Sequence, residues 1–246
     1  MAEFDRPTIA AQRAGTAAAI DEGLRSYMLK VYNYMGIGLV VTGLVSYFSA
    51  QAAVGADGQL TAWGSLIFQS PLMWVIAFAP LAFVLVLSFG INKLSGATAQ
   101  LLFWVFAAVM GLSLSSIFMV YTDASIAKVF FISAATFGAM SLYGYTTKRD
   151  LTGIGNFLIM GLIGLIIASI VNIFLASSML DFAISAIGVL IFVGLTAYDT
   201  QRIKESYDEG HGAEVLQKTA VMGALSLYLD FINLFLMLLR LFGNRE

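Results

Sequence analysis

Seven long apolar stretches constrain this chain more than any other feature of its sequence. They are residues 31–50, 72–90, 97–121, 126–147, 154–176, 182–199 and 219–242, and the sixth is the shortest. A helix needs about 20 apolar residues to cross the hydrocarbon core of a bilayer. The sequence therefore predicts an all-α integral membrane protein with seven transmembrane helices.

The composition supports lipid as the main solvent. Hydrophobic residues make up 59% of the chain and charged residues 11%, whereas soluble domains carry about 25% charged residues. The net charge of −2 argues against a nucleic-acid partner. The absence of cysteine excludes disulfides, thiolate metal sites and cysteine nucleophiles. A single histidine argues against a histidine-based metal site or a Ser-His-Asp triad.

The basic residues predict the orientation. With the N-terminus in the cytosol, ten Lys and Arg residues fall on the cytosolic side and three, Lys128, Arg240 and Arg245, on the other. Basic residues gather in cytosolic connections. The first 30 residues contain no apolar run of the kind found in a cleavable signal. We expect residues 1–28 to form a polar cytosolic tail and residues 29–246 to form the transmembrane domain.

Arg240 and Arg245 are discordant with this topology, because seven crossings place the C-terminus outside. A re-entrant sixth or seventh segment would return the tail to the cytosol and improve the count. The connections are short except 51–71 and 200–218, which predicts one compact bundle. No internal repeat of the transporter type is evident.

Asp230 is the one acidic residue deep within a predicted span, eleven residues into the seventh segment. That position is roughly 16 Å along the helix, near the middle of the membrane. Steps of 4, 3, 4, 3 and 4 residues place small or polar residues and one Met on its face, namely Thr219, Gly223, Ser226, Asp230, Asn233 and Met237. Because ionisable residues within a membrane are costly, this stripe is expected to face the bundle interior or a water-filled cavity.

Two interpretations of Asp230 remain open. It handles ions or protons, or it holds neighbouring helices together through hydrogen bonds involving Ser226 or Asn233. Asn172, in the fifth segment, is a further candidate for lining a cavity. Gly161, Gly164 and Ala168 on the same segment have the spacing of helix-packing residues.

Asp199 ends the sixth segment and is the second candidate. Two carboxylates close together in a medium of low dielectric constant do not both ionise easily and titrate as a unit. Carboxylate oxygens are also the ligands that calcium prefers. Simple counting places Asp199 near the cytosolic surface and Asp230 deeper. They meet only if the seventh helix projects into the cytosol, tilts, or starts later than residue 219.

Three motifs resemble the Bax inhibitor family, also called the transmembrane Bax inhibitor motif family. They are AYDTQ at 197–201, ALSLYLDFINLF at 224–235 and GLSLSS at 111–116. The likeness runs from about residue 25 to the C-terminus. It implies six helices around a central seventh and a pH-sensitive calcium leak gated by Asp199 and Asp230, which would also be the calcium ligands. It further implies a latch at Lys93, where some bacterial relatives have Arg, and a bacterial inner membrane.

These features together predict a calcium leak channel that is not an enzyme and has no cofactor beyond the permeant ion. Its expected partners are the lipid bilayer, calcium ions and protons; the sequence identifies no protein partner. An intramembrane aspartyl protease also pairs Tyr-Asp with a second Asp, but the Gly-x-Gly-Asp and Pro-Ala-Leu motifs are absent. A retinal protein would need a Lys within the last helix for its Schiff base, and the sequence has none beyond Lys218 at the start of that segment. A proton-coupled transporter using Asp230 and a non-transporting regulatory protein remain as alternatives.

Overall fold

The computed structural model describes residues 6–245, with side chains from residue 22 onward. Its helices, in chain order, are α1 (Arg6–Ala53), α2 (Ala62–Phe68), α3 (Leu72–Gly90), α4 (Gly96–Leu114), the 3₁₀ helix η1 (Ser115–Met119), α5 (Asp123–Thr146), α6 (Thr152–Leu175), α7 (Ser178–Glu205) and α8 (Ala213–Phe242). All of the α-helices except α2 are long and apolar enough to cross a membrane. The prediction of seven transmembrane helices is therefore confirmed.

Several helix ends differ from those predicted, and two of these differences lie around the candidate aspartates. α7 has 28 residues and reaches Glu205, so the sixth span is not short. α8 begins at Ala213, six residues before the predicted start. Charged residues in the last turns of α7 and the first turns of α8 end the apolar pattern, but the helical hydrogen bonds continue through them.

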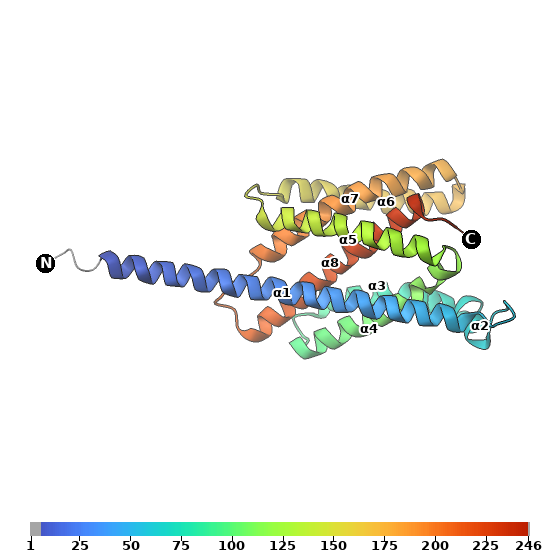
Figure 1. Ribbon diagram of the computed structural model, residues 1–246, viewed down its shortest axis with the longest axis horizontal. Coiled ribbons are helices and arrows are strands. Elements are labelled where there is room, and N and C mark those ends of the chain that lie inside the picture. Colours follow the sequence, from blue (N-terminus) through green and yellow to red (C-terminus); the bar gives the residue numbers. More distant parts are fainter. Residues whose placement is uncertain (1–5, 246) are drawn as a thin grey trace.

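The first helix is much longer than its apolar segment. α1 contains 48 residues, which corresponds to about 72 Å at 1.5 Å per residue. It extends beyond the other helices in Figure 1 and runs without a break through residue 28, where the sequence predicts the polar tail to end. Residues 1–5 of that tail and Glu246 lie outside the described residues.

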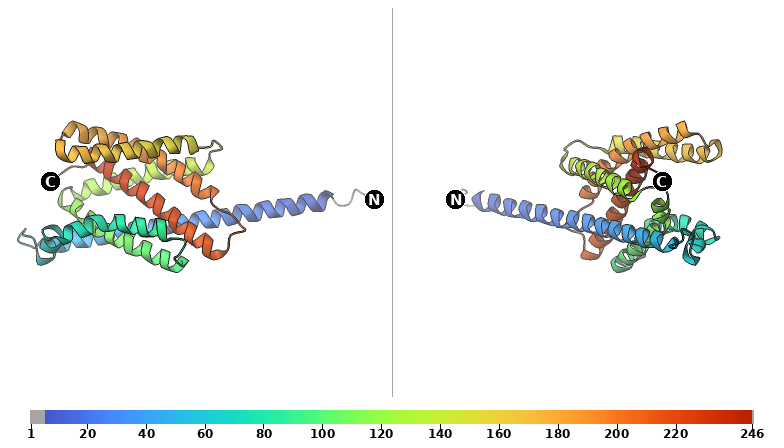
Figure 2. Two further views of the ribbon diagram at one scale, coloured as in Figure 1. Left: turned by 180° about the vertical axis from the view of Figure 1, so that it is seen from behind. Right: turned by 45° about the vertical axis from the view of Figure 1, so that its right-hand side comes forward.

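α8 is the central helix, as the sequence predicts. It runs diagonally between one group formed by α1, α3 and α4 and another formed by α5, α6 and α7 (Figures 1 and 2). It packs against α1, α4, α5 and α7 and more lightly against α3, while α6 packs on α7. In its apolar segment 72% of the residues are buried, against 6–39% in the other six spans.

The connections lie at two ends of the bundle. The end at which α1 enters, here called the N-side, carries the connections 91–95, 147–151 and 206–212, and the C-terminus lies at the opposite end (Figure 1). There the backbone N–H of Thr122 donates to the carbonyl of Asn244 at 3.1 Å. The N–H of Asn244 donates to Ser125 Oγ at 2.9 Å. These bonds fasten the end of the chain to the start of α5.

Candidate functional site

Two glycines allow neighbouring helices to approach the segment 197–201 of α7 closely. A side chain on Gly144 of α5 would collide with the carbonyl of Ala197, and one on Gly155 at the start of α6 would collide with the ring of Tyr198. Small residues permit such close approach of backbones in membranes. The part of α7 that carries Asp199 is thereby held between α5 and α6.

A chain of hydroxyl groups also fixes this segment of α7. Thr200 donates to the carbonyl of Thr196 at 2.7 Å. The proton between Thr200 and Ser141, whose oxygens are 3.0 Å apart, therefore comes from Ser141. The hydroxyl of Tyr32 in turn donates to Ser141. These bonds join α1, α5 and α7 beside Asp199.

Gln201 attaches the α5–α6 connection to α7. Its side-chain oxygen accepts a hydrogen bond from the N–H of Leu151 at 2.8 Å. Its side-chain nitrogen donates to the carbonyl of Arg149 at 2.8 Å. The motif around Asp199 is thus largely a set of anchors that hold one carboxylate in position.

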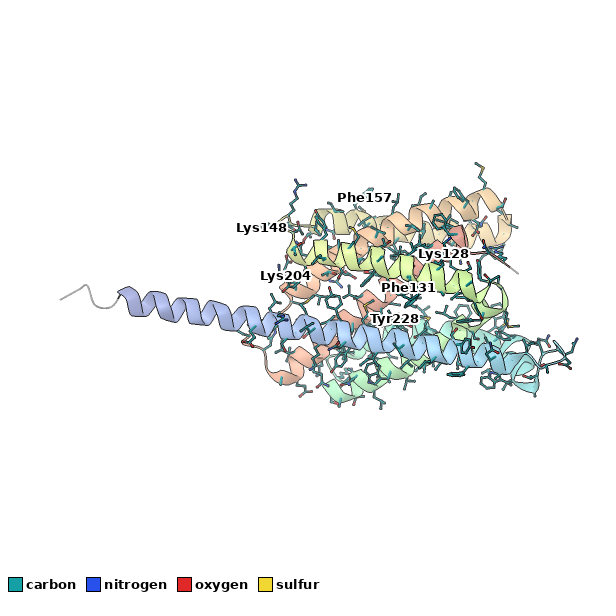
Figure 3. The ribbon with its side chains drawn as sticks, in the orientation of Figure 1. Lys128, Phe131, Lys148, Phe157, Lys204 and Tyr228 are labelled. Carbon is teal, nitrogen blue, oxygen red and sulfur yellow. The ribbon has the colours of Figure 1, made fainter. Side chains whose placement is uncertain are left out.

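On the α8 side, Tyr228 serves as the anchor. Its side chain is fully buried and its hydroxyl lies 2.6 Å from Oγ1 of Thr42. Because Thr42 donates its own proton to the carbonyl of Ala107 at 2.8 Å, Tyr228 is the donor of the first bond. Phe103 and Phe106 meet the Tyr228 ring edge to face. Figure 3 labels Tyr228, which lies in the middle of the bundle.

The anchors bring Asp199 and Asp230 close enough for their charges to act on each other. Asp230 is 5% exposed and the Asp199 side chain is 14% exposed. The extra helical turns of α7 and α8 explain the meeting, since Asp199 lies inside α7 and α8 projects beyond its predicted start on the N-side. Oδ2 of Asp230 is buried and has no hydrogen-bond partner within the described part of the chain.

Arg202 is the cation of this site, and the sequence analysis does not identify it. Its guanidinium lies 3.5 Å from Oδ1 of Asp199. It also donates to Ser226 Oγ, at 3.5 Å, and stands 5.7 Å from the centre of the Tyr198 ring. The spacing of three residues between Asp199 and Arg202, which pairs side chains on a helix, is the signal that could have found it.

Lys93, the predicted latch, lies elsewhere. It is exposed in the α3–α4 connection, and residues 22–245 show no ion pair between Lys93 and either aspartate. Gly96, three residues on, packs against Gln217, which precedes Asp230 by 13 residues or about 20 Å of helix. In this structure the cation beside the pair comes from α7, not from the α3–α4 connection.

The three predicted cavity-lining residues lie in different surroundings. Ser226 is half-buried and contacts Arg202. Asn233 is half-buried and donates to the carbonyl of Leu229 in its own helix at 2.8 Å. Asn172 accepts from the N–H of Ser177 at 3.1 Å in the α6–α7 connection, about 30 Å along α7 from Asp199. Of these three residues, only Ser226 lies at the site, through its contact with Arg202.

Calcium takes six to eight oxygen ligands in a tight protein site. Here Asp199, Asp230 and Ser226 supply two carboxylates and one hydroxyl, and no group of three or more Asp, Glu, His or Cys that could hold a metal ion occurs among the side chains of residues 22–245. Such a sparse set suits brief binding of a passing cation better than permanent retention. Asp150, an acidic residue in the α5–α6 connection on the N-side, has a different environment, because hydrogen bonds from the hydroxyl and N–H of Thr152 lower the pKa of its carboxyl.

Comparison with known proteins agrees with these motifs. The sequence model of a family described as "Inhibitor of apoptosis-promoting Bax1" matches residues 24–246. The protein RP147 of Rickettsia prowazekii is 52% identical, with 92% of each chain covered. The Inner membrane protein YbhL of Escherichia coli K12 is 50% identical over 91% of this chain and 94% of its own. A protein of Caulobacter vibrioides is 48% identical over the full length of both chains.

Proposed function

This chain belongs to the Bax inhibitor family, and from that premise we propose that it is a pH-sensitive calcium leak channel gated by Asp199 and Asp230. One observation carries the proposal: two carboxylates from adjacent helices meet inside a membrane bundle, and one buried oxygen of Asp230 has no partner among the described residues. A buried polar atom without a partner calls for an explanation, and a cation that binds in passing supplies one. The proposed activity is transport and not catalysis.

The pH sensitivity follows from the placement of the pair. Two adjacent carboxyls in a medium of low dielectric constant take up and release protons as a unit. A protonated pair has lost the negative charge that attracts both Arg202 and a calcium ion. Proton uptake therefore changes both the internal ion pair and the affinity for the permeant ion. Asp150 does not take part, because its lowered pKa keeps it ionised throughout the range of pH about 5 to 8.

We further propose that the N-side faces the cytosol and that the membrane is a bacterial inner membrane. Lys148 and Lys204 lie toward the N-side and Lys128 toward the opposite end (Figure 3). This distribution is the one that the positive-inside rule requires. The relative from Escherichia coli, named an inner membrane protein, supports the choice of membrane.

Calcium flux in proteoliposomes tests the proposal. We expect the wild-type protein to pass calcium at a rate that changes between pH about 5 and 8. Asp230→Asn should abolish or greatly weaken the flux, because the ion loses its deep anionic ligand. Asp199→Asn should alter the pH profile, because it breaks the coupling while Asp230 remains. Asp150→Asn is the matched control and should leave the profile unchanged, since the Asn side-chain oxygen can accept the same hydrogen bond from the N–H of Thr152.

The proposal fails if Asp199→Asn and Asp230→Asn both retain the wild-type flux and pH profile. The two residues would then be helix-packing groups. A proton-coupled transporter is the second candidate, favoured by the deep burial of Asp230. Accumulation of substrate against its gradient, driven by a pH difference across the vesicle, would identify the transporter, whereas a channel lets calcium only run down its gradient.

A further inference from the structure

A small cavity opens beside the aspartate pair on the N-side. It has a volume of about 280 Å³ and lies between α7 and α8. Its lining comprises Arg202, Ile203, Ser206, Thr219, Met222, Gly223 and Ser226. Arg202 and Ser226 border this cavity and also contact each other at 3.5 Å. The two therefore form the boundary between the cavity and the carboxylates.

The guanidinium of Arg202 uses the oxygens that a cation would need. It contacts Oδ1 of Asp199 and Oγ of Ser226, each at 3.5 Å, and its charge also acts on Asp230. Carboxylate and hydroxyl oxygens are the ligand types that calcium takes in proteins. The three groups available to calcium are Asp199, Asp230 and Ser226. A calcium ion that reaches them from the cavity would meet the positive charge of Arg202, which already contacts Asp199 and Ser226.

We propose that Arg202 is a built-in competitor of calcium, which closes the N-side mouth of the aspartate pair and must swing away for the ion to bind Asp199, Asp230 and Ser226. This inference rests on the proposed function and adds to it the residue that keeps the site closed. It also places the closing group on α7 itself. Opening therefore requires only a side-chain movement into the cavity, with no displacement of α3 or of the α3–α4 connection.

The contacts of Arg202 suit a closing group that can be displaced. Its side chain is 54% exposed, and a single pair of atoms at 3.5 Å joins it to Asp199. Two-pronged pairing between Arg and a carboxylate is the strong form, and half-exposed single contacts are weak. Lys204, two residues later, differs from Arg202. Its Nζ donates a hydrogen bond of 2.8 Å to the carbonyl of Tyr145 and not to an acidic residue of the site.

Equilibrium binding of calcium to the purified full-length protein in detergent tests this inference separately from transport. Arg202→Gln should raise the calcium affinity about tenfold, because a positive charge next to the ion is removed. Arg202→Lys should stay near the wild-type affinity, because it keeps the charge. Lys204→Gln is the matched control, with an equal loss of charge in the same turn, and should change the affinity by less than about twofold.

The same variants are then measured for calcium flux in proteoliposomes, with thermal unfolding as the check that each is folded. Arg202→Gln should raise the basal leak.

The inference is overturned if folded Arg202→Gln binds calcium no more tightly than wild type, or no more tightly than Lys204→Gln. It is equally overturned if neither wild type nor Arg202→Gln binds calcium. A flux that depends on Asp230 together with unchanged binding in Arg202→Gln would reject the competitor and keep the channel. Tighter binding in Arg202→Gln without flux in any variant would keep the competitor and reject the channel.

Discussion

Asp230 owes its place in the bundle to Tyr228, two residues earlier on α8. The Tyr228 hydroxyl donates a hydrogen bond to Thr42 of α1, and the Thr42 hydroxyl donates one to the carbonyl of Ala107 on α4. A single residue of α8 is thereby tied to two other helices. Because α8 is a continuous helix through Tyr228 and Asp230, fixing Tyr228 also fixes the depth and rotation of the carboxylate that follows it.

Replacement of Tyr228 by Phe tests this anchor. The ring contacts remain and one buried hydrogen bond is lost, so we expect a loss of about 1 kcal/mol in stability. Thermal unfolding in detergent measures the effect. Tyr143→Phe, in which the lost hydroxyl belongs to a side chain that is 45% exposed on α5, should be nearly neutral. Equal melting temperatures for Tyr228→Phe and wild type would show that the bond to Thr42 does not hold α8.

Residue types in the sequence identified the two aspartates but not what surrounds them. Asp230 is conspicuous because a carboxylate interrupts an apolar helix. Arg202 falls beyond the apolar stretch, so a hydropathy pattern assigns it to a connection, although it lies within the last turns of α7. The hydroxyl chain through Ser141 and Tyr32 joins residues more than one hundred positions apart. No local pattern reports such a contact.

At the scale of the helix, the sequence predicted the existence of each span better than its ends. The second span matches α3 at both ends, Leu72 and Gly90, because turn residues flank a run that is apolar except for Ser88. The predicted sixth and seventh spans are shorter than α7 and α8, because charged residues at the N-side end the apolar pattern without ending the helix. This error created the apparent separation of Asp199 from Asp230, and the longer helices remove it.

The contact between α5 and α7 depends on Gly144. An added methyl group there would collide with the carbonyl of Ala197, a backbone atom that cannot rotate away. We expect Gly144→Ala to lower stability by about 1–3 kcal/mol, the range for overfilling a packed interface. The calcium flux should also change, because α7 shifts at Asp199. Thermal unfolding and flux on one preparation would report both effects.

Gly138→Ala provides the control on the same helix. Gly138 has nothing within 4 Å of the added atom, and Ala favours a helix over Gly by up to about 1 kcal/mol. It should therefore be neutral or slightly stabilising, with unchanged flux. If Gly144→Ala behaves like Gly138→Ala, the close packing of α5 on α7 does not determine the position of Asp199.

At the scale of the whole molecule, α8 is the seventh helix long and apolar enough to cross the membrane. Seven crossings place the two ends of the chain on opposite sides. The last residues are bound on the side opposite to the start of α1, through Asn244 and through Arg245, which lies over the ring of Tyr121 at 5.7 Å. Arg240, one of the two discordant cations, pairs with Asp181 at 3.8 Å, which offsets its charge at that end. The discordant charges thus have local partners in the folded bundle.

We therefore expect the N- and C-termini to lie on opposite sides of the membrane, with the C-terminus outside the cytosol. Paired reporters fused after Glu246, one active only in the cytosol and one active only outside it, measure this directly. The same reporters placed in the 206–212 connection serve as the internal standard, because that connection should lie in the cytosol. A cytosolic signal at both positions would mean that α8 enters the bundle and returns without crossing. The bonds of Asn244 to Thr122 and Ser125 would then have to be absent in the membrane, while the first six crossings would stand.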